Sequence, residues 1–370
     1  MKAVRLTLVA LLVAASLAVS APSARAACGW DVLKVPTPGT DFSVFAMDAS
    51  YASRKLGWLI GYHWESGSDL FSMRWNGVKW KLIDIPTPKG EAYATSVAAL
   101  ADGTAWVVGT TSVDHTGFRL FFNGTRWIKV KGPANEPAGT ALSGVAAFGP
   151  KSVWAVGSTN TDSVIERWNG KRWSMVDHVD LGTASQYLKS IAIVPGTKDL
   201  WAAGGYNDGS PHPMALHRTG GVWVNEPVPD PGEAALQSVD ASGTGDAWLV
   251  GYRYGGSYWL NQTWHWDGVS WTAMTTPSPS TTFPGQFLYD VGAISPGNAY
   301  AAGYFNPVSG GNDPYAIRWD GLNWGDVSPA SGDEAFEFRG VAKIPGTKKV
   351  SLIGFELVGG SFQPRVVTGC

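Results

Sequence analysis

The sequence predicts an all-β fold: a seven-bladed β-propeller with four antiparallel strands in each blade. Three observations carry this prediction. A strand motif recurs seven times at intervals of 47 to 52 residues, hairpin and tryptophan signals follow the copies, and the two ends of the chain complement each other. A fixed period of this length is the signature of a repeat architecture, in which each repeat forms one supersecondary unit.

The recurring motif is a short apolar string that ends in glycine. Its copies are Trp58-Leu-Ile-Gly61, Trp106-Val-Val-Gly109, Trp154-Ala-Val-Gly157, Trp201-Ala-Ala-Gly204, Trp248-Leu-Val-Gly251, Tyr300-Ala-Ala-Gly303 and Ser351-Leu-Ile-Gly354. The many glycines and prolines of the chain are typical of short strands and tight turns, and not of helices.

Each repeat is predicted to form four strands. A strand of small residues such as Ser96-Val97-Ala98-Ala99 comes first, and the glycine-ending string is the second strand. The third strand runs into an Asn-Gly or Asp-Gly pair, as in Arg74-Trp75-Asn76-Gly77. Such pairs tolerate the positive φ angles of a type I′ hairpin turn. The fourth strand carries a tryptophan and usually ends at prolines, which belong at the end of an outer strand.

The two ends of the chain predict how the ring closes. The last repeat stops at Val366-Val367-Thr368-Gly369-Cys370, where a third strand reaches its turn. The segment from Cys28 to Pro38 aligns with Val78 to Pro88, which contains the fourth strand of the first repeat. The N-terminal strand is therefore expected to join the C-terminal blade. A solenoid is the alternative, but its terminal repeats would be capped by polar variants.

The first 26 residues are interpreted as a signal peptide. Lys2 and Arg5 precede an apolar run from Leu6 to about Val19, and Ala24-Arg25-Ala26 suits cleavage after Ala26. A membrane anchor is the alternative, but the run is short for a span of about 20 residues. We therefore expect a secreted protein without membrane insertion, whose residues 27–370 form a single propeller domain.

The chain has two cysteines, Cys28 and Cys370, at the two ends of the expected mature protein. Exported proteins meet oxidising conditions, so a disulfide between them is predicted. The strand alignment places both where other blades carry their hairpin turn. The alternative is a lipid anchor on Cys28, which would require an aliphatic residue where Arg25 stands.

The order of glycine, turn, tryptophan and prolines resembles the kelch repeat of propellers like the central domain of galactose oxidase. Gly204-Gly205-Tyr206-Asn207 is similar to the double-glycine signature of that family, although the other copies have a single glycine. The resemblance covers the mature chain and implies its fold, but a fold of this kind does not imply a function.

No catalytic or metal-binding motif stands out. A galactose-oxidase copper site requires a cysteine crosslinked to a tyrosine, and both cysteines are already assigned to the chain ends. The six histidines are scattered without metal-ligand spacing, so no metal and no cofactor is expected. Trp266-Asp267-Gly268 resembles the Asp-box of sialidase propellers, but a hairpin turn explains these residues. With a net charge of −2 and no basic cluster, a nucleic-acid partner is not expected.

Two tryptophans remain once the repeat tryptophans are assigned to packing between blades. Trp64 and Trp259 are predicted in loops between second and third strands, whereas Trp264 lies two residues before Trp266 and is assigned to packing. The candidate ligand-binding residues at that end of the propeller are Trp64, Tyr206, Asn207, Asp208, Tyr252, Tyr254, Tyr258, Trp259, Tyr304, Asn306, Asp313 and Tyr315. Aromatic rings among amides and carboxylates suit sugar binding, although long loops also collect such residues because they turn.

Three functions remain open at this stage. The leading hypothesis is a monomeric extracellular binding module for a carbohydrate, or for a cell-surface or other protein partner. The alternative is a glycan-active hydrolase, lyase or epimerase with its site at the propeller axis. A third hypothesis is a structural or assembly scaffold.

Overall fold

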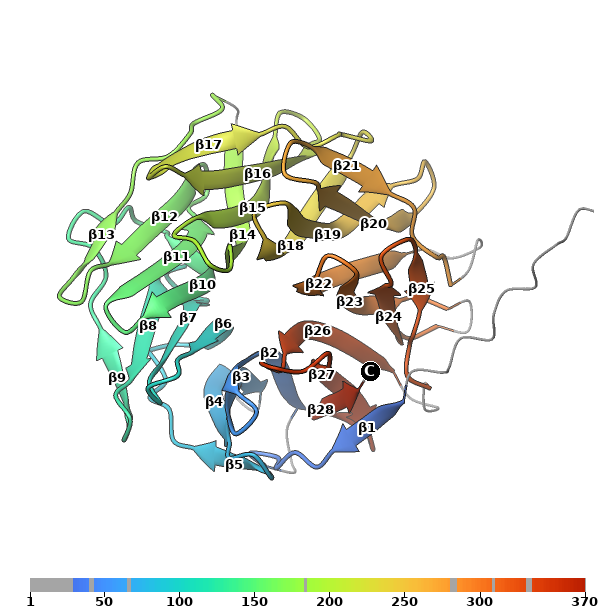
Figure 1. Cartoon of the computed structure of the whole chain (residues 1–370). Helices are drawn as coiled ribbons and strands as arrows, with labels where there is room; N and C mark the ends of the chain where they lie inside the picture. Colours follow the sequence, from blue (N-terminus) through green and yellow to red (C-terminus); the bar gives the residue numbers. More distant parts are fainter. Residues whose placement is uncertain are drawn as a thin grey trace, which may run out of the picture.

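The computed structural model describes residues 29–39, 43–64, 68–182, 185–279, 285–307, 310–330 and 335–369. Its strands form seven four-stranded antiparallel sheets arranged as blades around a central axis (Figure 1). The described residues contain no helix. The predicted fold class is therefore confirmed.

The blades follow one another along the chain. Blade 1 comprises β2 (Ser43–Ser53), β3 (Leu56–Trp64), β4 (Ser68–Trp75) and β5 (Trp80–Ile83); blade 2 comprises β6 (Ala92–Ala99), β7 (Ala105–Thr111), β8 (Gly117–Phe122) and β9 (Trp127–Val130). Blade 3 comprises β10 (Ala141–Gly149), β11 (Ser152–Ser158), β12 (Ser163–Trp168) and β13 (Trp173–Met175); blade 4 comprises β14 (Ser185–Ile193), β15 (Leu200–Asn207), β16 (Pro211–Thr219) and β17 (Val222–Glu226). Blade 5 comprises β18 (Ala234–Gly243), β19 (Asp246–Tyr254), β20 (Trp259–Trp266) and β21 (Trp271–Met274); blade 6 comprises β22 (Gln286–Ser295), β23 (Asn298–Phe305), β24 (Asp313–Trp319) and β25 (Trp324–Asp326).

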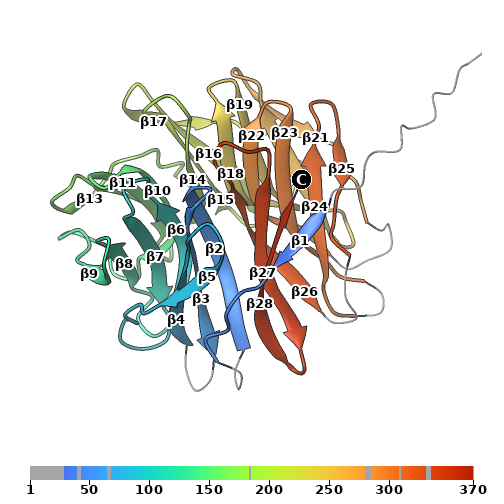
Figure 2. The same ribbon diagram turned by 60° about the horizontal axis from the view of Figure 1, so that its bottom comes forward.

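Blade 7 takes its strands from both ends of the chain. Its order is β1 (Trp30–Leu33), β28 (Ser361–Gly369), β27 (Val350–Val358) and β26 (Phe336–Lys343). Trp30 lies opposite Gly369, and both views show β1 beside β28 (Figures 1 and 2). The indole Nε1 of Trp30 also donates a 2.6 Å hydrogen bond to the carbonyl of Val327, after blade 6. The predicted closure by the N-terminal strand is confirmed, while Cys28 and Cys370 lie outside the described residues.

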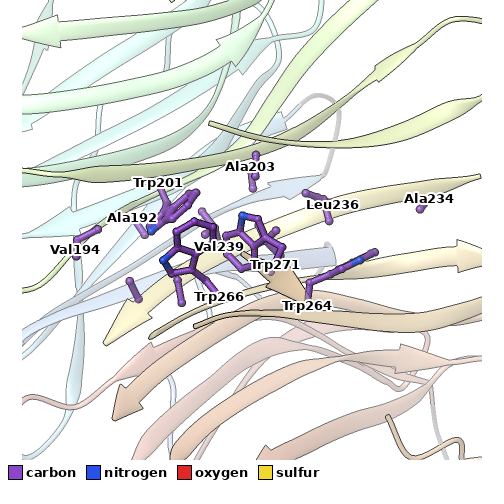
Figure 3. Close-up of a cluster of buried hydrophobic side chains, with 14 residues drawn as sticks. Ala192, Val194, Trp201, Ala203, Ala234, Leu236, Val239, Trp264, Trp266 and Trp271 are labelled. Atoms are coloured by element: carbon purple, nitrogen blue, oxygen red, sulfur yellow. The ribbon is translucent and has the colours of Figure 1, made fainter. Parts of the chain in front are cut away.

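The core consists of seven hydrophobic clusters, each lying between two adjacent blades. Between blades 4 and 5, Trp201 of β15 meets Trp266 and Trp271 of blade 5 (Figure 3), with ring centroids 5.0 and 4.9 Å away. Trp264 is fully buried in the same cluster. The repeat tryptophans and Trp264 therefore pack between blades, as the sequence predicts.

The motif glycine is required by a backbone contact. Each inner strand carries a bulge. The motif glycine of the second strand pairs with the inner-strand residue that precedes the bulge, as Gly157 does with Leu142. A Cβ atom on Gly157 would lie 1.9 Å from the carbonyl oxygen of Ala141. The other six motif glycines face an equivalent carbonyl at 1.8 to 2.1 Å. Only glycine fits this position, so all seven repeats keep it.

The hairpin tips differ from the predicted type I′ turns. Trp75 pairs with Trp80, which leaves a four-residue tip. The side-chain oxygen of Asn76 accepts hydrogen bonds from the backbone N–H groups of Val78 and Lys79, at 3.0 and 2.9 Å. Positive φ occurs at Gly77 and not at Asn76. A type I′ turn requires positive φ at both central residues, so this prediction is wrong; the asparagine stabilises the tip through its side chain.

Candidate functional site

The inner-strand bulges bring seven side chains from all seven blades to the propeller axis. The extra residues of the bulges are Met47, Thr95, Ser143, Lys189, Gln237, Tyr289 and Arg339. All seven line one polar cavity of about 120 Å³. A bulge redirects a side chain out of the regular alternation of a strand, which explains why these residues face the axis.

The residues that follow the bulges form hydrogen bonds between neighbouring blades. Asp48 accepts a 2.8 Å hydrogen bond from the backbone N–H of Val97 in blade 2. Asp290 accepts hydrogen bonds from the Ser238 hydroxyl at 2.5 Å and from the Val341 N–H at 2.6 Å. Burial raises the pKa of Asp48 to about 6, and burial with the nearby charge of Asp48 raises that of Asp290 to about 7.

Tyr289 lines the cavity, and five more tyrosines lie toward the end of the propeller that carries the connections between second and third strands. We call this end the loop face. Together with four charged or amide side chains, the six tyrosines form the axial mouth, defined as Tyr62, Tyr93, Tyr187, Lys189, Gln237, Tyr252, Tyr289, Tyr304, Glu337 and Arg339. The rings of Tyr62 and Tyr93 meet edge to face at 4.9 Å, and those of Tyr289 and Tyr304 stack at 5.7 Å.

The axial mouth carries two cations among these phenols. The Cζ atom of Arg339 lies 4.2 Å from the ring centroid of Tyr289, and its guanidinium forms an ion pair with Glu337. The Nζ atom of Lys189 lies 5.7 Å from the Tyr187 ring and forms no ion pair within the described part of the chain. Lys189 contacts solvent inside the cavity but is surrounded by protein, and this burial lowers its pKa.

Four phenols of the axial mouth have raised pKa values and stay protonated at neutral pH. Burial, with smaller effects from Tyr289 and Tyr187, raises the pKa of Tyr252 to about 12. Burial also raises the pKa values of Tyr62, Tyr187 and Tyr304. The mouth therefore offers neutral hydroxyl groups beside an ammonium and a guanidinium.

The size of the axial cavity restricts what it can admit. Small-molecule sites usually measure about 300 to 1,000 Å³, whereas this cavity measures about 120 Å³. Its two deepest carboxylates, Asp48 and Asp290, are engaged in hydrogen bonds between blades. The cavity therefore suits a single side chain or a chain end, and a whole sugar ring would have to stay outside.

The predicted site residues divide into separate groups. Tyr252 and Tyr304 belong to the axial mouth. Trp259 begins β20, with its ring centroid 5.2 Å from Tyr252 and 5.5 Å from Tyr254. Trp64 ends β3 and is 46% exposed, and Tyr254 is 39% exposed. The two tryptophans thus lie at strand ends and not in loops, because their strands extend further than the repeat pattern indicates.

A second group lies at the loop-face end of blade 4. Tyr206 stacks on the His212 ring with centroids 5.0 Å apart. The His212 Nε2 lies 3.0 Å from Asp208 and its Nδ1 lies 2.5 Å from Asp230. The hydrogen bond to Asp230 is the main cause that raises the pKa of His212. Asn207 accepts a 2.9 Å hydrogen bond from the Gly209 N–H, so its side chain stabilises the same turn.

The candidate ligand-binding residues of blade 6 mainly make contacts within the fold. Asn306 donates a 2.6 Å hydrogen bond to Asn312, and the half-buried Asp313 begins β24. Tyr315 is fully buried between blades 5 and 6, where its hydroxyl donates to the carbonyl of Pro277. Its prediction as a ligand-facing residue is wrong, because strand alternation in β24 turns it into the core. Tyr258 of blade 5 is half-buried.

The sequence prediction missed most of the axial mouth. Tyr93, Tyr187 and Lys189 lie in inner strands, which the sequence identified only as strands of small residues. A usable signal exists: a large residue directly precedes the small or acidic one in Lys189-Ser190, Tyr289-Asp290 and Arg339-Gly340, at the same place in each repeat. That position is the bulge.

Within the described ranges, no group of three or more His, Cys, Asp or Glu side chains could hold a metal ion. The same part of the chain has no helix that is long and apolar enough to cross a membrane.

Comparisons with known proteins support the fold. Neither a protein-family model nor a curated protein matches the sequence. Among solved structures, the chain is similar to "YCF48 bound to D1 peptide", with 17% identity, a TM-score of 0.57 and coverage of 92% of this chain and 96% of that one. YCF48 from Cyanidioschyzon merolae has 14% identity, a TM-score of 0.58 and coverage of 93% and 99%. A protein of unknown function from Dyadobacter fermentans has 12% identity, a TM-score of 0.54 and coverage of 92% and 97%.

Proposed function

We propose that this protein is an exported binding propeller that holds a segment of a protein partner across the axial mouth. The observation that carries the proposal is the mouth itself, where tyrosines and two cations surround a cavity that suits one side chain. Tyrosine and arginine are the residue types that dominate binding energy in protein interfaces, because both combine apolar area with hydrogen bonding.

Two further observations support a peptide ligand. The Arg339 side chain lines the axial cavity and is 24% exposed, so its accessible N–H groups could donate to a carbonyl or carboxylate of a ligand. One fold neighbour is described as bound to a peptide, so a propeller of this architecture can take such a ligand. Gln237, which donates a 3.4 Å hydrogen bond to the Tyr252 hydroxyl, would add an amide for backbone recognition.

Export and the terminal disulfide are part of the same proposal. The leader of residues 1–26 supports export, and the register of β1 with β28 supports the crosslink. A Cβ atom on Gly369 would lie 2.1 Å from the carbonyl oxygen of Gly29. Because these glycines adjoin Cys370 and Cys28 in the sequence, the pairing favours a bridge between the two cysteines.

Carbohydrate is the second candidate ligand, and a different observation favours it. Trp64 and Tyr254 are the most exposed aromatic side chains of the loop face among the described residues, and Trp259 lies beside Tyr254. Exposed rings of this kind can stack on the apolar face of a sugar. This site would lie at the edge of the mouth and not inside its cavity.

The two candidates are separated by panning a phage-displayed random peptide library on the oxidised protein (residues 27–370), with a glycan array in parallel. Enriched peptides are then titrated by fluorescence anisotropy against Lys189→Gln and Arg339→Gln. Loss of one charged hydrogen bond should weaken binding roughly tenfold or more, whereas Trp64→Ala should leave peptide affinity unchanged. The proposal would be overturned if the peptides bound both mouth variants with the affinity of the parent, or if panning enriched no peptide. Glycan binding lost in Trp64→Ala or Trp259→Ala would establish the carbohydrate candidate.

A further inference from the structure

Blade 4 lacks an aromatic residue that five other blades carry just before their hairpin tip. The residues at this position are Trp75, Phe122, Trp168, Trp266 and Trp319, and blade 4 has Arg218 instead. The aromatic residue normally packs on the second-strand tryptophan of the preceding blade. Trp168 lies 5.2 Å from Trp106 in this way, and Trp319 lies 5.0 Å from Trp248.

A groove lies at this position between blades 3 and 4. Its volume is about 530 Å³, and it reaches inward to Trp154 of β11 and Arg167 of β12. An equivalent groove between blades 2 and 3 measures about 600 Å³, but Trp168 lines it and Trp106 does not. Arg218 therefore changes the wall of the groove and not its size: a guanidinium covers the buried Trp154 indole, where an aromatic ring covers Trp106 in the neighbouring interface.

Two guanidinium groups converge on that indole. The Cζ atoms of Arg167 and Arg218 lie 5.3 and 4.8 Å from the ring centroid of Trp154. Burial, with a further effect from the charge of Arg167, lowers the pKa of Arg218. Asp177 also lies on the groove wall, yet within the described ranges neither arginine forms an ion pair with it or with any other acid. Asp199 lies near enough to act on the charge of Arg218, but no direct ion pair among the described residues neutralises either guanidinium.

The chemistry of the walls favours a peptide over a sugar. Val176, Val179, Val222 and Trp223 give the groove an apolar side. The Trp154 ring is already covered by the guanidiniums, so it offers no free platform for a sugar ring. An acidic side chain with an apolar neighbour would match both features, because a carboxylate pairs with guanidinium in a planar, directional way.

We propose that this groove, which we call the Arg218 groove, is a second binding site that takes an Asp or Glu side chain of a protein partner, with an apolar residue beside it. The site is separate from the axial mouth, since its residues come from β11, β12, β13, β16 and β17 and from the segments that follow β13 and β16. It does not depend on the function proposed for the mouth.

The test uses two fluorescein-labelled peptides, one alternating glutamate with leucine and the other with glutamine in place of glutamate. Each is titrated by anisotropy into the oxidised protein (residues 27–370). The glutamate peptide should bind, and the glutamine peptide should bind roughly tenfold or more weakly. Arg218→Trp restores the aromatic residue of the other repeats and replaces the guanidinium over Trp154 by a ring. It should keep the fold, verified by its melting temperature, and lose the same factor in affinity.

A control variant locates the effect. Arg74→Gln removes a guanidinium that lies over Trp58 in blade 1, where Phe122 fills the corresponding space. It should bind the glutamate peptide like the parent. Equal binding of the two peptides, no binding of either, or undiminished binding by Arg218→Trp would overturn the proposal. The proposal would also be overturned if the protein bound polygalacturonate instead of the peptide and Arg218→Trp abolished that binding.

Discussion

Replacing Asp290 by asparagine should stabilise the protein at high pH and have little effect at low pH. The pKa of this carboxyl is raised from 3.8 to about 7, mainly by burial and secondly by the charge of Asp48. The folded protein therefore holds this proton more tightly than the unfolded chain does. The stability contributed by the proton is fully present below about pH 4, falls as the pH rises, and is lost once the pH passes about 7.

The size of the stability change follows from the raised pKa of Asp290. Each pH unit over which only the folded state is protonated changes the free energy of unfolding by about 1.4 kcal/mol, so the interval from pH 5 to 8 corresponds to about 3 kcal/mol. Polar side chains line the adjoining cavity of about 120 Å³, and water there would reduce the penalty. We expect a change of about 1 to 3 kcal/mol for this reason.

Asparagine is a close substitute at this position. Its carbonyl oxygen can accept from the Val341 N–H, and its amide can donate to the Ser238 hydroxyl, so both contacts of Asp290 are kept. Guanidinium unfolding of parent and Asp290→Asn, followed by tryptophan fluorescence at pH 5 and pH 8, measures the effect. The stability advantage of the variant should grow by about 1 to 3 kcal/mol between the two pH values. Asp48→Asn should show the same sign and a smaller change, because the pKa of Asp48 is about 6. An advantage that is equal at both pH values would refute the reasoning.

Three further predictions concern the ring itself. Gly157→Ala should lower stability by about 3 kcal/mol or more, because its Cβ would meet a carbonyl oxygen at 1.9 Å. The control Gly149→Ala lies in the same blade, and because its Cβ meets nothing within 4 Å it should change stability by less than about 1 kcal/mol. Equal melting temperatures for the two variants would contradict the contact. Cys370→Ser should remove a crosslink worth at most about 5 kcal/mol, seen as a lower melting temperature than that of the oxidised parent, and two free thiols in the non-reduced parent would disprove the bridge. Glu166→Gln should cost about 1 to 3 kcal/mol in chemical denaturation, since the buried Arg119 would lose its 2.9 Å charged hydrogen bond to that carboxylate and keep only Glu136 as an acidic partner; a neutral result would show that Glu136 alone compensates the charge of Arg119.

The architecture could be predicted because its causes are local and repeated. Gly157 and its equivalents mark the second strand through one close backbone contact, and the prolines and tryptophans mark the outer strands. The complementary ends predicted the pairing that the structure shows between Trp30 and Gly369. Arg218 was not singled out from the sequence, which alone could not show that its guanidinium lies over Trp154 in another blade.

The candidate site was predicted only in part. Tyr252 and Tyr304 were placed correctly toward the loop face, whereas Tyr315 faces the core. Tyr289 and Arg339 were missed because a bulge shifts the alternation of their strands by one residue, and regular alternation is the assumption behind any assignment of faces.

The sequence by itself determined the number of blades, the order of strands and the closure of the ring, since these depend on neighbours within one repeat and on the two chain ends. Only the tertiary structure decided which side chains meet at the axis and between blades. Lys189 and Arg339 belong to different blades and lie far apart along the chain, yet both line the same cavity. The physical reason is that the propeller converges all seven inner strands on one axis, and contacts there depend on ring closure and bulge geometry, not on spacing in the sequence.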